Sequence, residues 1–212
     1  MLRDKIILGQ HNPLDKNSTI KKFLINTRQE NLFLKYINFL KEQNSHTNLV
    51  GKSTLKDPWN SHILDSIQIL PIIKNKKSSI LDLGSGAGLP GIVLSISGCE
   101  NITLIDSNGK KINFLNLIKK KLNLKINIVL GRIEGLNNIK YDIITSRALA
   151  NLSKLLTYSH KFMKKNTVLI FLKGKTVNEE IKEAQKKWNF KFIKQQSFSD
   201  ERGSLLIIKN IK

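Results

Sequence analysis

Apolar residues in the first 77 positions recur with the spacing of amphipathic helices. A helix is predicted from Ile20 to Lys41, because four apolar side chains fall on one of its faces: Phe33, Tyr36, Ile37 and Leu40. A second is predicted from Asp57-Pro58, an N-cap followed by proline, to about Leu70. Residues 1–77 are therefore expected to form a helical segment that packs on a core made by residues 78–212, in one unit.

Three polar residues of the second helix, His62, Asp65 and Ser66, are spaced i, i+3 and i+4 and so share a face. Such a face could line a cleft. The spacing by itself favours an ordinary hydrogen-bonded surface.

After residue 78 the pattern becomes an alternation of short apolar runs and amphipathic segments. The predicted strands are Ile80–Leu83, Ile102–Asp106, Ile126–Leu130, Tyr141–Ser146, Val168–Leu172 and Leu205–Lys209. The predicted helices between them are Pro90–Ser97, Lys110–Leu122, Leu152–Met163 and Val177–Trp188. This alternation indicates an α/β fold with a mostly parallel sheet and helices on both faces, in which ligands bind at the carboxyl ends of the strands.

The first of these strands runs into a segment with four glycines, Gly84 to Gly91. In one register, Gly86-x-Gly88-x-x-Gly91 matches the dinucleotide fingerprint, with an acid twenty residues after Gly86 at Asp106. In the other, Asp82 and Gly84-x-Gly86-x-Gly88 match the first loop of S-adenosylmethionine (SAM) methyltransferases. The second register is favoured, because the first would make Asp82 to Ser85 the end of a buried strand.

Polar residues also follow the next three predicted strands. Asp106 ends the second strand, where its carboxylate can accept hydrogen bonds from both ribose hydroxyls of a nucleoside. The alternative is that Asp106 caps the helix that begins near Asn108. After the third strand, Glu134 and the main chain of Ile133 could bracket an adenine, the alternative being a solvated loop acid. Ser146-Arg147 follows the fourth. The four strand ends together predict a nucleoside site at one sheet edge.

Composition bears on the partner and the compartment. A formal net charge of +20 and a pI of about 10.1 favour a polyanion such as nucleic acid, although 31 of the 36 basic residues are lysine, which AT-rich coding also produces. One cysteine, Cys99, rules out an intramolecular disulfide, and four scattered histidines without metal-ligand spacing predict no metal. The start, Met1 to Lys5, lacks a signal-peptide pattern and no apolar run could span a membrane, so a cytoplasmic protein is expected.

Several motifs together resemble the RsmG (formerly GidB) family of bacterial 16S ribosomal RNA guanine-N7 methyltransferases. The matching segments are Leu81 to Gly91, Leu104 to Leu115, His62-Ile63-Leu64-Asp65-Ser66, Ser146-Arg147-Ala148, Leu172-Lys173-Gly174 and Glu201-Arg202, within roughly residues 30 to 210. Ala87 stands where proline is frequent. Gly203 stands where histidine is frequent, which puts any role of that position in doubt.

The resemblance implies a Rossmann-like class I SAM-dependent methyltransferase fold, with seven strands and an N-terminal helical extension. It implies SAM as cofactor and 16S rRNA or the small ribosomal subunit as partner. A monomer is expected by default, because the sequence shows no coiled-coil heptad. SAM contacts transfer to Gly84, Leu89, Ile133-Glu134 and Arg147, which join Gly86, Gly88 and Asp106 as expected cofactor-binding residues.

The missing motifs agree with guanine N7 as the acceptor. Methylation of an adenine amine usually requires the motif Asn/Asp-Pro-Pro-aromatic after strand four, and residues Thr145 to Ala148 at that place do not match it. Methylation at C5 of a pyrimidine requires a cysteine nucleophile, and Cys99 lies before strand two, away from the predicted site. Guanine N7 carries a lone pair and no proton, so no catalytic base is expected.

On the substrate side the expected residues are Ser146, Lys173, Arg202 and His62. Arginine usually donates hydrogen bonds to O6 and N7 of guanine together, but N7 must stay free to accept the methyl group. Arg147 is therefore expected to contact the cofactor, O6 or a phosphate. The alternative for Arg147 is an ion pair with Asp142 or Glu134. Two other functions stay open at this point: an NAD-dependent oxidoreductase and a non-catalytic rRNA-binding protein.

Overall fold

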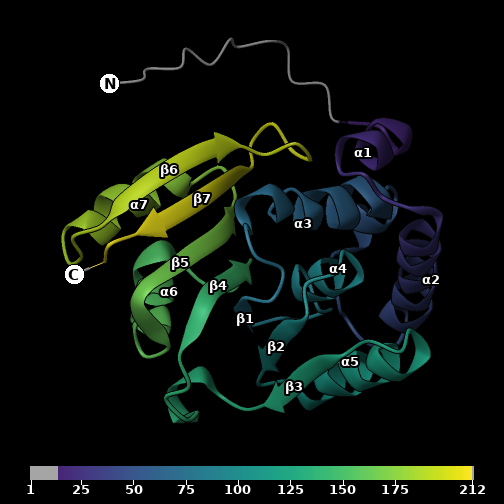
Figure 1. Cartoon of the computed structure of the whole chain (residues 1–212), viewed down its shortest axis with the longest axis horizontal. Helices are drawn as coiled ribbons and strands as arrows, with labels where there is room; N and C mark the ends of the chain where they lie inside the picture. The colour runs from purple at the N-terminus through teal and green to yellow at the C-terminus, as the bar shows by residue number, and fades with distance from the viewer. Residues whose placement is uncertain (1–13, 212) are drawn as a thin grey trace.

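The computed structural model describes residues 14–211, and its centre is a seven-stranded sheet in the order β3-β2-β1-β4-β5-β7-β6 (Figure 1). Strands β1 to β5 are parallel, and β7 runs antiparallel to both of its neighbours, β5 and β6. The strands are β1 Ser79–Leu83, β2 Asn101–Asp106, β3 Ile126–Leu130, β4 Tyr141–Arg147, β5 Met163–Lys173, β6 Lys191–Gln196 and β7 Ser204–Lys209. The order reverses between β1 and β4, so their carboxyl ends form the switch point where ligands of such sheets bind.

All six predicted strands are present, and the sequence prediction missed the seventh, β6. Every residue of β6 is exposed, because it is the edge strand of the sheet. A strand without a buried face has no reason to alternate apolar and polar residues, so the pattern gave no signal there.

The four predicted helices of the core are also present, as α4 Gly91–Ile96, α5 Gly109–Lys121, α6 Leu152–His160 and α7 Val177–Gln185. Two of them begin at asparagine caps. The side chain of Asn108 accepts a hydrogen bond from Lys110 N, and that of Asn151 accepts one from Lys154 N, so each satisfies a backbone donor that a helix start leaves free.

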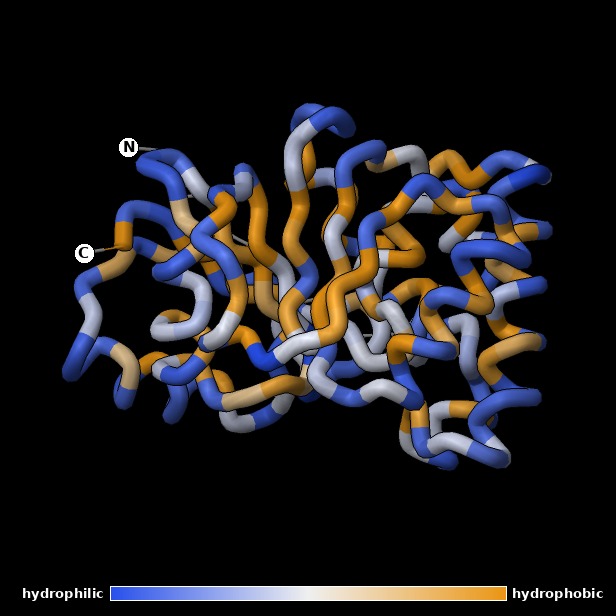
Figure 2. Tube along the Cα trace, turned by 90° about the horizontal axis from the view of Figure 1, so that it is seen from below, coloured by the Kyte–Doolittle hydropathy of each residue, from blue (hydrophilic) through white to orange (hydrophobic). Residues whose placement is uncertain are grey.

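Two apolar cores lie on opposite faces of the sheet. In β1, Ile80 joins the core under the N-terminal helices with α4 and α5, while Leu81 and Leu83 join the core under α6 and α7. This is the period-two alternation of a strand buried on both faces. Figure 2 shows the result as apolar strands inside and polar helix faces outside.

The first predicted helix is two helices, α1 Lys16–Lys22 and α2 Thr27–Asn44, so the prediction of one continuous helix from Ile20 to Lys41 was wrong. The helical conformation is interrupted at Leu24, whose φ is 52°. It starts again at Asn26, whose side chain and that of Gln29 cap each other's backbone N–H groups. A capping box of this kind sets a helix start that apolar spacing cannot reveal.

The second predicted helix begins where expected, since the Asp57 carboxylate accepts a hydrogen bond from Asn60 N at 3.1 Å. The segment is irregular: after the short turn η1 Lys52–Leu55 come a π-helix η2 Trp59–Leu64, a short α3 Asp65–Ile67 and a 3₁₀ turn η3 Leu70–Ile72. Its polar face is buried, with His62 1% and Ser66 0% exposed, so the surface interpretation was wrong. Short π-helical turns are frequent at functional sites.

The N-terminal helices contact the glycine segment directly. Tyr36 of α2 is fully buried, and its hydroxyl donates to the Ala87 carbonyl at 2.9 Å. Met1 to Lys5 and His11, which entered the predictions on targeting and metal binding, lie outside the described residues. Within residues 14–211, no helix is long and apolar enough to cross a membrane.

Candidate cofactor site

The glycine segment forms a tight loop after β1, with φ of 65°, 57° and 88° at Gly84, Gly86 and Gly88. Gly86 has the most room of the three, because an added Cβ would make only ordinary contacts at 3.9 Å, with Gly84 O and Lys111 Nζ, so a ligand can approach its main chain. Gly88 faces inward, where an added Cβ would overlap the side chain of Ile92. Gly86 therefore leaves room for a ligand beside the loop, whereas Gly88 allows Ile92 to pack closely against it.

Buried polar groups hold this loop in place. Ser85 exchanges hydrogen bonds with the main chain of Ile105 in β2, through its backbone N at 2.9 Å and its hydroxyl at 3.1 Å. Asp82, fully buried, accepts a hydrogen bond from Gly91 N at 3.0 Å. Burial raises the pKa of Asp82 to about 7, and the hydrogen bond from Gly91 N opposes that rise. The loop is therefore fixed from both β2 and α4.

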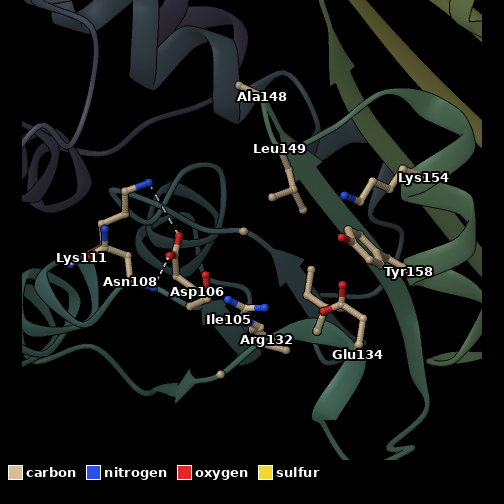
Figure 3. A pocket seen from close by; sticks show the side chains of 14 residues that line it. Ile105, Asp106, Asn108, Lys111, Arg132, Glu134, Ala148, Leu149, Lys154 and Tyr158 are labelled. Atoms are coloured by element: carbon tan, nitrogen blue, oxygen red, sulfur yellow. Dashed lines mark hydrogen bonds and ion pairs between the residues drawn. The ribbon is translucent and has the colours of Figure 1, made fainter.

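A cavity of about 610 Å³ lies at the carboxyl ends of β1 to β4 (Figure 3). Figure 3 shows Asp106, Asn108 and Lys111 on one side of it, and Lys154 and Tyr158 of α6 on the other. The lining residues are Gly84, Ile105, Asp106, Ser107, Asn108, Lys111, Gly131, Arg132, Ile133, Glu134, Ala148, Leu149, Lys154 and Tyr158. Its volume is in the range of small-molecule and cofactor sites.

Asp106 lies at the end of β2 and borders this cavity. Its carboxylate accepts hydrogen bonds from Gly86 N and Asn108 N, both at 2.9 Å, and Lys111 Nζ is 4.0 Å away. The helix cap that was its alternative role is filled by the side chain of Asn108. Asp106 thus ties the glycine loop to β2 while its side chain borders the cavity.

The segment after β3 forms the opposite wall. Ile133 is buried and Glu134 is exposed, and both line the cavity within the 3₁₀ turn η4 Ile133–Gly135. A hydrogen bond from its own backbone, and then one from Tyr158, lowers the pKa of Glu134, so its carboxylate is ionised at neutral pH.

A second cavity of about 440 Å³ adjoins the first, and the two share Gly84, Lys111 and Ala148. Three expected cofactor residues line this second cavity and not the first: Gly86, Leu89 and Arg147. Gly88 lines neither. Ala148, at the junction, has a φ of 53°, a conformation unusual for a residue with a Cβ and often found at functional sites.

Arg147 contacts the N-terminal helical segment. Its Nη1 donates to the Ser61 carbonyl at 2.9 Å and to Asp65 Oδ2 at 2.8 Å, and its Nη2 lies 3.1 Å from Nδ1 of His62. Neither of the acids considered as alternative partners, Asp142 and Glu134, is bonded to it. Asp142 instead pairs with Lys164 and Ser79, which lowers its pKa to about 2.

The environment of His62 fixes its proton. Arginine can only donate, so Nδ1 accepts from Arg147 and Nε2–H donates to the Thr54 hydroxyl at 3.1 Å. Burial, followed by the charge of Arg147, lowers the pKa of His62 to about 3. His62 is therefore a neutral imidazole with both ring nitrogens engaged.

The remaining residues expected on the substrate side are bonded within the protein. Ser146 is 1% exposed and donates to the Leu83 carbonyl at 2.9 Å. Lys173 donates to the Ala150 carbonyl and pairs with Glu180 at 2.5 Å, beside a third cavity of about 640 Å³. Arg202 is exposed and pairs with Asp200 at 3.2 Å.

Only Gly84, Asp106, Ile133 and Glu134 of the lining were expected site residues. The residues that were missed include Lys111, Leu149, Lys154 and Tyr158. Lys154 and Tyr158 are spaced i, i+4 on α6, a signal that would have placed them on one face together but not at the cavity. Leu149 packs over Gly84 so closely that a Cβ there would meet its side chain. Within residues 14–211, no group of three or more His, Cys, Asp or Glu could hold a metal ion.

Comparison with known sequences identifies a family. The family model GidB, rRNA small subunit methyltransferase G, matches residues 29–206. The ribosomal RNA small subunit methyltransferase G of Orientia tsutsugamushi (strain Ikeda) is 45% identical over 181 residues, which cover 84% of this chain and 89% of that protein. That of Rhodospirillum rubrum is 38% identical over 176 residues, covering 83% of this chain and 88% of that protein.

Solved structures agree with the fold. The ribosomal protein L11 methylase from Lactobacillus delbrueckii subsp. bulgaricus has a TM-score of 0.58 at 18% identity, over 69% of this chain and 76% of its own. The glycopeptide N-methyltransferase MtfA, solved with S-adenosyl-L-homocysteine, has a TM-score of 0.59 at 7% identity, over 69% of this chain and 89% of its own. At such identities only the fold is shown, and it confirms the predicted Rossmann-like class I methyltransferase architecture.

Family membership selects the SAM register of the glycine loop over the dinucleotide register, and an enzyme over a non-catalytic binding protein. The sequence match spans both the N-terminal helices and the sheet with its glycine loop. The chain therefore belongs to the rRNA small subunit methyltransferase G (RsmG/GidB) family of SAM-dependent enzymes.

Proposed function

We propose that this rRNA methyltransferase modifies N7 of a guanine in 16S rRNA, and that it does so by positioning alone. The observation that carries the proposal is a nucleoside-sized cavity at the switch point whose lining, within the described part of the chain, includes no histidine and no cysteine. SAM supplies a methyl group on a positively charged sulfur.

The residues present fit this cofactor. Asp106 offers a carboxylate for ribose hydroxyls, and Ile133 and Glu134 offer an apolar and a polar wall for adenine. Gly84, Gly86, Leu89 and Arg147 line the adjoining space, and the open face of Gly86 exposes main chain there. Gly88 supports the loop from the inside through its packing against Ile92 and Leu115.

Two candidate groups for proton abstraction or covalent attack are unsuited to it. His62 is buried and neutral, with both ring nitrogens hydrogen-bonded. Cys99 is buried before the amino end of β2, the end opposite the cavity, and burial raises the pKa of its thiol to about 11. Guanine N7 has an in-plane lone pair and loses no proton, so it needs neither a base nor a nucleophile.

For such an acceptor, the work of the chain is to align N7 with the methyl group and exclude water. Holding two reactants in line can contribute roughly 7–11 kcal/mol to catalysis. The excess of Lys and Arg, at a net charge of +20, favours the RNA backbone through contacts that weaken as salt is added. We further propose that the enzyme acts in the cytoplasm as a monomer, that Ser146 and His62 shape the substrate side by supporting β4 and Arg147, and that Lys173 and Arg202 approach the RNA backbone.

The test is methylation of 16S rRNA transcripts and of small subunits from a strain that lacks this enzyme, using radiolabelled SAM. We expect 7-methylguanosine as the only methylated nucleoside in the digest. Transcripts made with 7-deazaguanosine, which has no N7 lone pair, should take up no label. Label on another atom, or on the 7-deaza transcript, would refute N7 as the acceptor.

A further inference from the structure

Both carboxylate oxygens of Asp65 are engaged, and each joins a different part of the fold. Oδ2 accepts from Arg147 Nη1 at 2.8 Å, at the end of β4. Oδ1 accepts from the Ser199 hydroxyl at 2.7 Å, in the loop between β6 and β7, and from Gln68 Nε2 at 3.2 Å. A carboxylate held from two sides cannot turn, so it offers Arg147 a fixed partner.

Arg147 has five N–H donors and uses three of them on Asp65, Ser61 and His62. The other two, on Nε and Nη2, have no partner within residues 14–211. The Arg147 side chain is about 18% exposed, and Asp65 is the one carboxylate among the described residues that forms an ion pair with it. Ser61 contributes a carbonyl and His62 a neutral ring, so Asp65 is the carboxylate in direct contact with the charge.

The pair lies where three cavities meet. Arg147 lines both the second and the third cavity. Asp65 lines the third and a further one beside Ser199 and Arg202. Arg147 is therefore in the wall between the space assigned to the cofactor and the space over the ends of β4 and β5.

We propose that Asp65 is a positioning residue for cofactor binding: it holds the Arg147 guanidinium in one orientation, with two donors left for SAM. Without it, a long and flexible side chain would have to be ordered at the moment of binding, at a cost in side-chain entropy. This inference rests on the proposed contact between Arg147 and SAM. It goes further by assigning a role to an acid that touches the cofactor only through that arginine.

The test measures SAM binding by isothermal titration, independently of RNA. Asp65→Asn keeps the shape of the side chain and removes its charge, and we expect the Kd for SAM to rise about tenfold, which corresponds to about 1.4 kcal/mol of binding free energy. The KM for SAM should rise equally, with the KM for rRNA within about twofold of wild type. If Asp65 only braced the fold, the fraction of binding-competent protein would fall and the Kd would stay unchanged.

A double-mutant cycle separates this inference from the role of Arg147. Arg147→Met should weaken SAM binding, and adding Asp65→Asn should then change nothing further. An equal loss from Asp65→Asn in both backgrounds would overturn the inference. If Arg147→Met binds SAM as tightly as wild type, the proposed contact between Arg147 and SAM is wrong. If Arg147→Met weakens SAM binding and Asp65→Asn does not, only the positioning role of Asp65 is wrong.

Two further variants calibrate the result. Ser199→Ala removes one bond that steadies Asp65 and should raise the Kd by only about twofold, on the scale of a single neutral hydrogen bond. Asp142→Asn is the matched control: its carboxylate is also partly exposed and ion-paired, but with Lys164, at the opposite end of β4. It should leave the Kd for SAM unchanged, and a rise equal to that of Asp65→Asn would also overturn the proposal.

Discussion

The residues at the strand ends differ between the two halves of the sheet: in one half they line cavities, and in the other they are bonded to other parts of the protein. At β1 to β3, Asp106, Ile133 and Glu134 line one cavity, and the open face of Gly86 lines the next. At β4 and beyond, the expected substrate residues are bonded to the protein itself, as Lys173 is to Glu180. A strand end thus fixes where a side chain is, while the elements packed around it decide whether that side chain is free for a ligand.

The reason for this difference lies in what covers each half. Both halves border a hollow, of about 610 Å³ at the ends of β1 to β4 and of about 640 Å³ at the ends of β4 and β5. In the half with β1 to β3, the strand-end residues Asp106, Ile133 and Glu134 line the hollow. The other half is approached by η2 and α3 on one side and by the β6–β7 loop on the other, and these bring acceptors such as Asp65. The following predictions test the contrast.

The largest expected effect is on the cofactor half. Asp106→Ala should raise the Kd for SAM by about 10- to 100-fold, because the two hydrogen bonds proposed between the ribose hydroxyls and its carboxylate would be lost. Isothermal titration measures it, with Glu100→Ala at the exposed amino edge as control. Unchanged affinity would remove Asp106 from the cofactor site.

Lys173→Met tests the other half. It leaves the Glu180 carboxylate, about 17% exposed, without its ion-pair partner, so the free energy of unfolding should fall by about 1–3 kcal/mol while the Kd for SAM stays the same. Denaturant unfolding measures the change. Lys186→Met is the control, because its pair with Glu183 is exposed and should matter by less than about 0.5 kcal/mol. If Lys173 also contacts the RNA backbone, as proposed above, the variant should bind rRNA more weakly, and unchanged rRNA binding would remove it from the RNA interface.

The pH dependence of stability tests the buried His62. The pKa of His62 in the folded protein is about 3, below the ordinary value of 6.5. Between these two pH values the imidazole is protonated in the unfolded chain and neutral in the folded chain. Its contribution is fully present above pH 6.5 and is lost as the pH falls toward 3, by about 1–2 kcal/mol between pH 7 and pH 5. Thermal unfolding of wild type and His62→Gln over this range should show a flatter curve for the variant. Parallel curves would mean that His62 does not resist protonation.

The smallest expected effect is at Arg202. Its pair with Asp200 is exposed, so Arg202→Ala should leave the denaturant midpoint of unfolding unchanged. If it contacts RNA phosphate, the salt dependence of rRNA binding should lose about one unit of slope. An unchanged slope would remove Arg202 from the RNA interface.

Much of the fold was readable from the sequence, because buried strands and amphipathic helices carry their period in the residues themselves. All six strands with a buried face were predicted, and the edge strand β6 was not, since none of its residues is buried. The break between α1 and α2 was missed because it depends on the mutual capping of Asn26 and Gln29, which apolar spacing does not report.

For the site, the sequence by itself determined the chemistry at the strand ends: the glycine loop, Asp106 and the Ile133–Glu134 turn follow from residue types just beyond parallel strands. Only the tertiary structure decided which groups oppose them. Lys154 and Tyr158 reach the cavity from α6, and Asp65 and His62 reach Arg147 from a segment more than 80 residues earlier in the chain. The physical reason is that local sequence sets periodicity and turn chemistry, whereas burial and pairing of a side chain depend on which distant elements pack against it.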